Sequence, residues 1–180
     1  MMKNNGIKYG LIYGGLSILL SMIVYFTSPE NMVSFTSWNF IAGLILMVAM
    51  LYLAAKKTRD DKGGYIPFGE ALVPALVTFI VGNLIGIIYM YVLTNFIDPG
   101  VQAIIQESTI EMQKGMFEMA GMSEDQILEA IERAEADMEG QFNFGSLVLG
   151  MLINILIMGL PISAIIAAIV KKKEPMIQQP

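Results

Sequence analysis

The chain has 180 residues, of which 55% are hydrophobic and 15% charged, with a mean hydropathy of +0.61 and a net charge of −5. A soluble domain usually carries about 25% charged residues, so this composition argues against a water-soluble protein. The sequence contains no cysteine and no histidine. It therefore lacks a disulfide framework, a thiolate nucleophile and the commonest general base and transition-metal ligand. We expect a membrane protein that is not an enzyme.

Four long apolar runs predict transmembrane helices, because about 20 apolar residues span the hydrocarbon layer of a bilayer. The runs are residues 7–27, 38–55, 70–96 and 144–170. The first run could also be read as a secretory signal peptide. It is long for one, and no small-residue cleavage site precedes Ser28. We expect it to be retained as a helix.

The connections between the runs differ in character. Residues 28–37 form a turn without a basic residue, whereas residues 56–69 form a basic loop with the turn signal Gly63-Gly64. Pro161 interrupts the last run. Asp98-Pro99-Gly100 ends the third helix.

Residues 97–143 make the one sizeable water-soluble segment, and their pattern predicts two amphipathic helices. Gly121 is a helix stop, and Ser123 with Gln126 forms a capping box at the start of the second helix. We expect the pair to pack on itself and on the ends of the transmembrane helices. The apolar stripes are Val101, Ile104, Ile105, Ser108, Met112, Met116 and Met119 in the first helix, and Ile127, Leu128, Ile131, Ala134 and Met138 in the second.

The charges are strongly one-sided. Nine of the eleven basic residues lie in the N-terminus, the second loop and the C-terminus, and eleven of the sixteen acids lie in segment 97–143. Basic residues in short loops mark the cytoplasmic side. Both termini are therefore predicted to be cytoplasmic, and the acidic helix pair extracytoplasmic. The nine basic residues are Lys3, Lys8, Lys56, Lys57, Arg59, Lys62, Lys171, Lys172 and Lys173.

Small residues recur at every fourth position of three runs, which permits close approach of helix backbones. Packing within one chain is the simpler interpretation, and a homodimer face is the alternative. The sets are Gly6, Gly10 and Gly14; Gly82 and Gly86; and Gly159, Ser163 and Ala167.

Asn83 and Asn154 are the polar side chains deep in the apolar runs. An amide facing lipid is costly, so each should face neighbouring helices. An interhelical hydrogen bond is the simpler role. A polar path for a substrate or ion is the alternative, although the middle of each run lacks the charged groups that coupled transport uses.

Glu70 begins the third helix, where the helix dipole stabilises a carboxylate. Its alternative role is a site at the cytoplasmic mouth together with Arg59 or Lys62. The acids Asp125, Glu129 and Glu132 share one helix face and could attract Ca²⁺. They lack the loop of a calcium cage, so a solvated acidic face is the better interpretation.

The stretch around the basic loop resembles a bacterial family of uncharacterised membrane proteins, domain of unknown function 4199. The residues that carry the resemblance are Arg59 with Asp60 and Lys62, Phe68-Gly69-Glu70-Ala71, and Asp98-Pro99. The resemblance covers nearly the whole chain in layout. It implies a four-helix protein of the bacterial inner membrane and supplies no activity, cofactor or catalytic residue.

Together these features predict an all-α, polytopic membrane protein with four transmembrane helices in one membrane domain, residues 1–180. The amphipathic pair lies between the third and fourth helices. We expect a non-enzymatic protein of the inner membrane that binds a partner through its acidic outer segment or its basic loop. A small transporter or channel near Asn83 and Asn154 is the alternative. Besides the lipid bilayer, a protein partner or a second copy is expected, with no nucleic acid, metal or cofactor.

Overall fold

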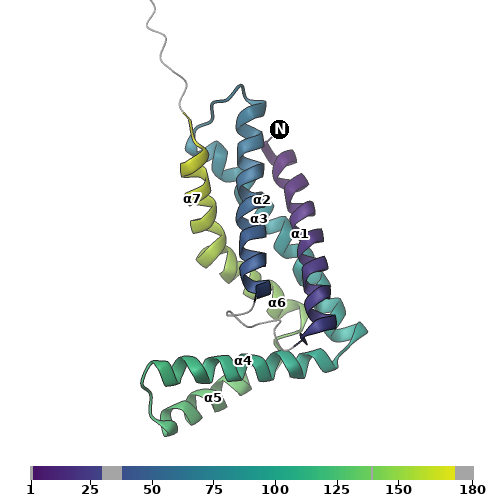
Figure 1. Cartoon of the computed structure of the whole chain (residues 1–180), viewed down its shortest axis with the longest axis vertical. Helices are drawn as coiled ribbons and strands as arrows, with labels where there is room; N and C mark the ends of the chain where they lie inside the picture. Colours follow the sequence, from purple (N-terminus) through teal and green to yellow (C-terminus); the bar gives the residue numbers. More distant parts are fainter. Residues whose placement is uncertain (1, 30–37, 139, 173–180) are drawn as a thin grey trace, which may run out of the picture. The chain divides into compact units, whose positions relative to one another are not determined.

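The computed structural model describes residues 2–29, 38–138 and 140–172, which are almost entirely helical (Figure 1). The elements are α1 (Met2–Thr27), α2 (Trp38–Asp61), α3 (Phe68–Val92), the π-helical turn η2 (Leu93–Ile97), α4 (Gly100–Met119), α5 (Glu124–Met138), α6 (Phe144–Asn154), the π-helical turn η3 (Ile155–Gly159) and α7 (Leu160–Val170). No strand occurs in the described residues, which hold one isolated β-bridge, Ile66 with Lys172. The all-α prediction is confirmed. Most of the turn 28–37, Glu139 and Lys173 lie outside the described residues.

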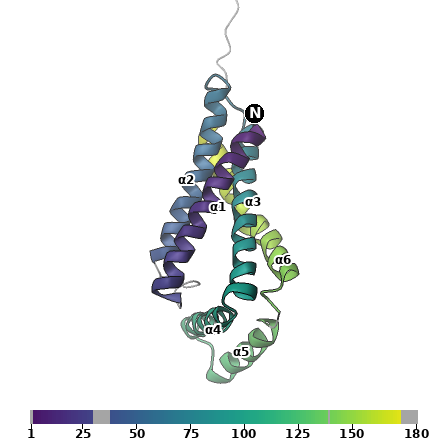
Figure 2. The same ribbon diagram turned by 90° about the vertical axis from the view of Figure 1, so that its right-hand side faces the viewer.

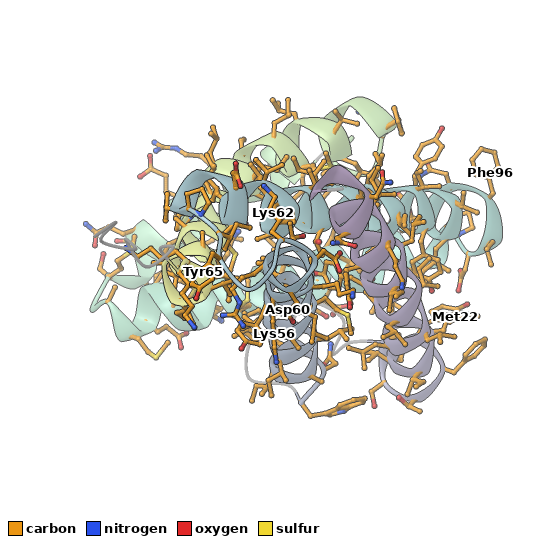
Figure 3. All side chains as sticks on the ribbon, turned by 90° about the horizontal axis from the view of Figure 1, so that it is seen from above. Met22, Lys56, Asp60, Lys62, Tyr65 and Phe96 are labelled. Atoms are coloured by element: carbon orange, nitrogen blue, oxygen red, sulfur yellow. The ribbon has the colours of Figure 1, made fainter. Side chains whose placement is uncertain are left out.

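Four helical segments are long and apolar enough to cross a membrane: Asn4–Thr27, Trp38–Asp61, Phe68–Ile97 and Phe144–Val170. They correspond to the four predicted runs and confirm a multi-pass protein. Large apolar side chains remain exposed on them, as expected of surfaces that meet lipid rather than water. Met22 and Phe96 point outward from their helices (Figure 3), and the Phe96 side chain is 71% exposed.

Helix α2 continues six residues beyond the predicted span, so the loop predicted over residues 56–69 was wrong in its extent. The Lys57–Asp61 ion pair at 2.9 Å, one turn apart, stabilises this added helical stretch. The Thr58 hydroxyl donates to the Ala54 carbonyl of the same helix at 2.8 Å. The true connector is residues 62–67. Gly63 and Gly64 adopt φ of +82° and +92°, which confirms the predicted turn.

Both later spans contain a widened turn next to a proline. In η2 the Asp98 N–H donates to the Leu93 carbonyl, five residues back, and Pro99 follows without an N–H. In η3 the Leu160 N–H donates to the Ile155 carbonyl, and Pro161 comes next. The interruption predicted at Pro161 is therefore a π turn that leaves the span helical.

Two compact units emerge from the contacts between residues. The first unit comprises the described residues of Met1–Ile18, Leu44–Gly86 and Met151–Pro180. Its buried centre is built by α2, α3 and α7. The buried side chains are Met47, Leu51, Ala55, Ile66, Ala71, Ala75, Phe79, Ile166, Ala167 and Val170.

Helix α1 packs on α3 in the first unit through its glycines (Figure 2). A Cβ on Gly6 or Gly10 would lie 2.7 Å or 2.6 Å from the Cβ of Val77 or Val81. In addition, the buried Thr78 hydroxyl lies 3.1 Å from the Gly6 carbonyl and donates to the Pro74 carbonyl of its own helix at 2.8 Å. The predicted role of these glycines in packing within one chain is confirmed.

The other small-residue sets have mixed outcomes. A Cβ on Gly82 would meet the Tyr13 ring, and one on Gly159 would lie 2.7 Å from the Phe79 ring. Gly86, in contrast, faces open space, so its predicted packing role was wrong.

The second unit comprises the described residues of Leu19–Gly43 and Ile87–Gly150. Its buried cluster joins Leu93 at the end of α3, Val101 and Ile105 at the start of α4, and Phe142, with Tyr25 of α1 packed against them. Helices α4 and α5 form a hairpin (Figure 1). The predicted docking onto the ends of transmembrane helices is confirmed for the start of α4, which packs against Leu93 and Tyr25.

Candidate functional site

The polar end of the first unit gathers the residues that the sequence singled out around the basic loop. The Arg59 guanidinium donates to the Val170 carbonyl at 3.5 Å and lies 3.5 Å from the Asp60 carboxylate. Val170 ends α7, so its carbonyl has no partner within the helix. Arg59 therefore caps α7 from α2, which is a role in holding two spans together.

Glu70 lies in the first turn of α3, as predicted, and its carboxylate pairs with the Lys62 ammonium. Of the two predicted partners, the structure brings Lys62 to Glu70, whereas Arg59 contacts Asp60 and Val170. Both side chains of the Lys62–Glu70 pair are partly exposed, so the pair contributes about 1 kcal/mol or less. It fixes the connector at the start of the third span.

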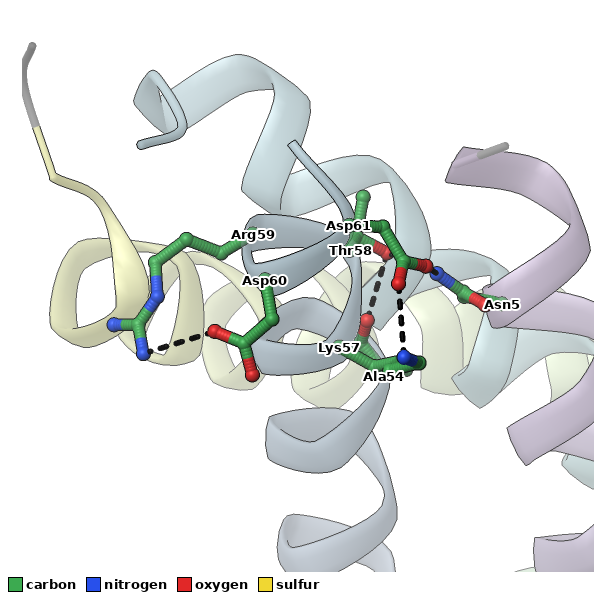
Figure 4. A network of polar contacts seen from close by, with 7 residues as sticks. All are labelled: Asn5, Ala54, Lys57, Thr58, Arg59, Asp60 and Asp61. Carbon is green, nitrogen blue, oxygen red and sulfur yellow. Dashed lines mark hydrogen bonds and ion pairs between the residues drawn. The ribbon is translucent and has the colours of Figure 1, made fainter. Parts of the chain in front are cut away.

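Sequence reasoning missed a second polar network on the same unit, drawn in Figure 4. The Asn5 amide of α1 donates to the Thr58 hydroxyl at 3.1 Å and to the Asp61 carboxylate at 2.9 Å. Asp61 also pairs with Lys57, and the four-residue spacing of these two was a readable signal. The contact between Asn5 and Asp61 spans 56 positions, so no local sequence pattern predicts it.

The end of α7 is tied to the connector by the β-bridge between Ile66 and Lys172. Each backbone N–H donates to the carbonyl of the other residue at 2.9 Å. The bridge sets the Lys172 ammonium 5.5 Å from the centre of the Tyr65 ring, a cation–π distance. Arg59, Lys62 and Lys172 thus come to one end of the first unit from three separate segments.

Asn83 and Asn154 were each expected to bond a neighbouring helix, and the structure contradicts this for Asn83. The Asn83 amide donates to the Phe79 carbonyl of its own helix at 2.8 Å, so the interhelical bond expected of this group was wrong. A carbonyl one turn back lies within reach of this short side chain, so its NH₂ group can donate within its own helix. Asn154 is half-buried and ends α6 directly before η3. No hydrogen bond joins the two amides in the described residues.

Asp98 holds the turn between α3 and α4 in the second unit, a role that its place in the predicted helix stop and in the family resemblance did not reveal. Its carboxylate accepts a hydrogen bond from the Tyr25 hydroxyl at 2.8 Å and another from the Gly100 N–H at 3.0 Å. The Gln102 amide meanwhile donates to the Thr94 carbonyl at 2.8 Å. That carbonyl is left without its usual helical partner because Asp98 N–H bonds one residue further back, to Leu93. The turn between α3 and α4 is thereby held by side chains.

The α4–α5 hairpin, residues 100–138, presents an acidic surface. Gly121, with φ of +76°, follows the end of α4, and the predicted capping box forms, with the Ser123 N–H donating to the Gln126 side chain at 3.0 Å. Among the hairpin side chains that the structure describes, eight acids are exposed, against the two bases Lys114 and Arg133. The eight acids are Glu107, Glu111, Glu118, Glu124, Asp125, Glu129, Glu132 and Glu135.

The apolar stripes of the hairpin are only partly covered. Ile105, Ile127 and Met138 are buried, but Met116, Met119 and Leu128 are 53%, 84% and 69% exposed. Their predicted place in a covered stripe was wrong. Leu128 is one position from buried Ile127, and a helix turns by about 100° per residue, so a two-helix hairpin cannot cover both.

The predicted calcium alternative finds no cage in the described residues, among which no group of three acidic side chains is placed to hold a metal ion. Glu129 pairs instead with Arg133, one turn along α5. The eight exposed acids of the hairpin are solvated carboxylates on a helical surface.

Four spans and a charged helical hairpin define a multi-pass helical membrane protein. The chain belongs to the family described as "Protein of unknown function (DUF4199)", whose profile matches residues 8–172. The match includes Arg59, the Phe68-Gly69-Glu70-Ala71 stretch and Asp98-Pro99, and confirms the family resemblance. No curated protein and no solved structure matches the chain.

Proposed function

We propose that this protein is a non-enzymatic component of the bacterial inner membrane that binds a protein partner through its acidic α4–α5 hairpin. The observation that carries the proposal is the excess of exposed acids over bases among the described side chains of the hairpin, eight against two. Only the Glu129–Arg133 pair neutralises any of them among the described residues. A surface with this much uncompensated charge attracts a basic partner and repels anionic lipid.

The exposed apolar side chains near the hairpin turn support a protein as the partner. Met119 is the last residue of α4 and is 84% exposed, with Met116 one turn earlier. Methionine is flexible and polarisable, and exposed methionines are common on surfaces that bind other proteins. Charge would steer the partner to the hairpin, and these side chains would be buried on contact.

Binding is better supported than catalysis, because the sequence contains neither cysteine nor histidine. The transporter alternative gains no support, since the Asn83 amide is bonded to its own backbone. The basic end of the first unit is the other candidate binding surface. A second copy of the chain would bring like charge to the hairpin, so self-association is less favoured there.

The proposal places both termini in the cytoplasm and the hairpin outside, on the distribution of basic residues. Since the chain has no native cysteine, single replacements give clean reporters. On intact cells, a membrane-impermeant maleimide should label Ser123→Cys, at the hairpin turn, and leave Lys62→Cys, in the connector, unlabelled until the cells are lysed. Labelling of Lys62→Cys on intact cells with protection of Ser123→Cys would reverse the topology.

Partner binding is tested by neutralising the hairpin without touching its packed face. In a variant with Glu111, Glu118, Glu132 and Glu135 all changed to glutamine, cross-linked recovery of the partner from native membranes should fall roughly tenfold or more. Lys114→Gln removes a charge of the opposite sign from the same surface and should leave recovery unchanged or higher. Equal recovery by the native chain and the neutralised variant at low salt would refute binding through these acids.

A further inference from the structure

The polar end of the first unit carries an excess of positive charge. Its described side chains include seven basic and three acidic groups. The basic groups are Lys8, Lys56, Lys57, Arg59, Lys62, Lys171 and Lys172, and the acidic groups are Asp60, Asp61 and Glu70. Figure 3, viewed onto this end, shows Lys56, Asp60, Lys62 and Tyr65 around the last turns of α2 and the connector.

Each of the three acids is already paired with a base. Asp61 lies 2.9 Å from Lys57, Asp60 lies 3.5 Å from Arg59, and Glu70 contacts Lys62. In the described part of the chain this leaves four lysines with no carboxylate at ion-pair distance. These four, Lys8, Lys56, Lys171 and Lys172, are named here the basic rim.

Two members of the basic rim are positioned by aromatic rings. The Lys172 ammonium lies 5.5 Å from the centre of the Tyr65 ring, and the Lys56 ammonium lies 5.9 Å from that of Tyr52. A ring face orients an ammonium without neutralising its charge. The backbone of Lys172 is also held by its bridge to Ile66. Lys56 and Lys172 are therefore cations in defined positions that no carboxylate of the described residues neutralises.

The position of the basic rim at the ends of the apolar spans indicates that the anion it binds is a membrane lipid. Lys56 directly follows the apolar run of α2, which is about 27 Å long as a helix, and Lys171 directly follows α7. The headgroup layer begins where such apolar runs end. On α1, Lys8 and Asn4 border a shallow hollow whose other lining residues are Ile7, Leu11 and Ile12. An acyl chain suits that apolar lining, whereas a soluble anion gains nothing from it.

We propose that the basic rim binds the phosphate headgroups of anionic phospholipids, with an acyl chain along α1. This inference does not rest on the hairpin and holds whichever partner the hairpin binds. Attraction of a lysine to an anionic membrane surface corresponds to roughly a fivefold gain in binding per residue. Removing three rim lysines should therefore reduce the preference for anionic lipid by on the order of a hundredfold.

Native mass spectrometry of the full chain tests the proposal. The detergent-solubilised protein is offered an equimolar mixture of phosphatidylglycerol and phosphatidylcholine with identical acyl chains, and the lipids it retains are counted. The native chain should retain phosphatidylglycerol, whereas the variant Lys56→Gln with Lys171→Gln and Lys172→Gln should keep only the roughly fivefold preference that Lys8 supplies. Lys114→Gln, which removes one exposed cation from the hairpin, should keep the full preference. If the triple variant does not fold, Lys171→Gln alone should still show a severalfold loss.

Three outcomes would overturn the proposal. The native chain could show no preference between the two lipids. Lys114→Gln could lose as much preference as a rim variant, which would indicate net charge rather than a site. Soluble glycerol phosphate at equal concentration could displace phosphatidylglycerol, which would assign the rim to a free phosphate compound instead of a lipid.

Discussion

Gly10→Ala should destabilise the protein by about 1–3 kcal/mol, the usual cost of overpacking. A Cβ on Gly10 would lie 2.6 Å from the Val81 Cβ and 3.1 Å from the Thr78 carbonyl oxygen. A Cβ and a backbone oxygen cannot rotate away, so the new methyl group must push α1 and α3 apart. Unfolding in mixed micelles, followed by circular dichroism, measures the loss.

Gly15→Ala is the matched control for Gly10→Ala. It lies on the same helix with nothing within 4 Å of its would-be Cβ. It should be neutral or slightly stabilising, because alanine is the better helix former. Equal destabilisation by the two changes would contradict the packing between α1 and α3. A change in oligomeric state at unchanged stability of the single chain would favour the homodimer face instead.

Asp98→Ala should loosen the turn between α3 and α4, because it removes the acceptor of the Tyr25 hydroxyl and of the Gly100 N–H. A hydrogen bond to a charged group contributes about 1.5–3 kcal/mol, so the loss should approach the upper value. Hydrogen exchange of the amides at the start of α4 should accelerate. Glu111→Ala, at an exposed acid in the same helix, should leave that exchange unchanged.

A double-mutant cycle with Tyr25→Phe separates the tyrosine contact from the rest. The single change Tyr25→Phe should cost less than Asp98→Ala, since the Gly100 contact remains. Once Asp98 is absent, Tyr25→Phe should cost little, so the effects of the two changes should not be additive. Additive effects would mean that the Tyr25 hydroxyl does not bond Asp98 in the folded protein.

The spans themselves follow from local information. Apolar runs of about 20 residues must form helices in lipid, because each backbone polar group has to be satisfied within its own segment. The hairpin is local too, since Gly121 supplies a positive φ and Ser123 with Gln126 caps the next helix. Likewise, Glu70 was correctly placed in the first turn of α3, because the helix dipole favours a carboxylate there.

The candidate site could be predicted only in part from the sequence. Arg59 and Glu70 were recognised from charge and position, yet the partner of Arg59 is the Val170 carbonyl, 111 positions away. Asn5 and Asp98 act through contacts 56 and 73 positions distant, to Asp61 and Tyr25 respectively. The prediction for Asn83 was wrong for the opposite reason: a partner on another helix was expected, and the amide bonds a carbonyl of its own helix. The spacing of residues in the sequence predicts which side chains are neighbours on one helix, but it does not predict which helices pack against each other.

The sequence by itself determined the four spans, the acidic hairpin and the one-sided distribution of basic residues, because each depends on composition or on neighbours within one helical turn. Only the tertiary structure decided which glycines face another helix, Gly10 but not Gly86, and which hairpin methionines remain exposed. It also decided which lysines keep an unpaired charge, since Lys62 meets Glu70 while Lys172 meets the Tyr65 ring. One physical reason applies to the glycines, the methionines and the lysines. Residues of one type that recur in one pattern differ in burial and in pairing, because a second segment of the chain brings different groups against each of them.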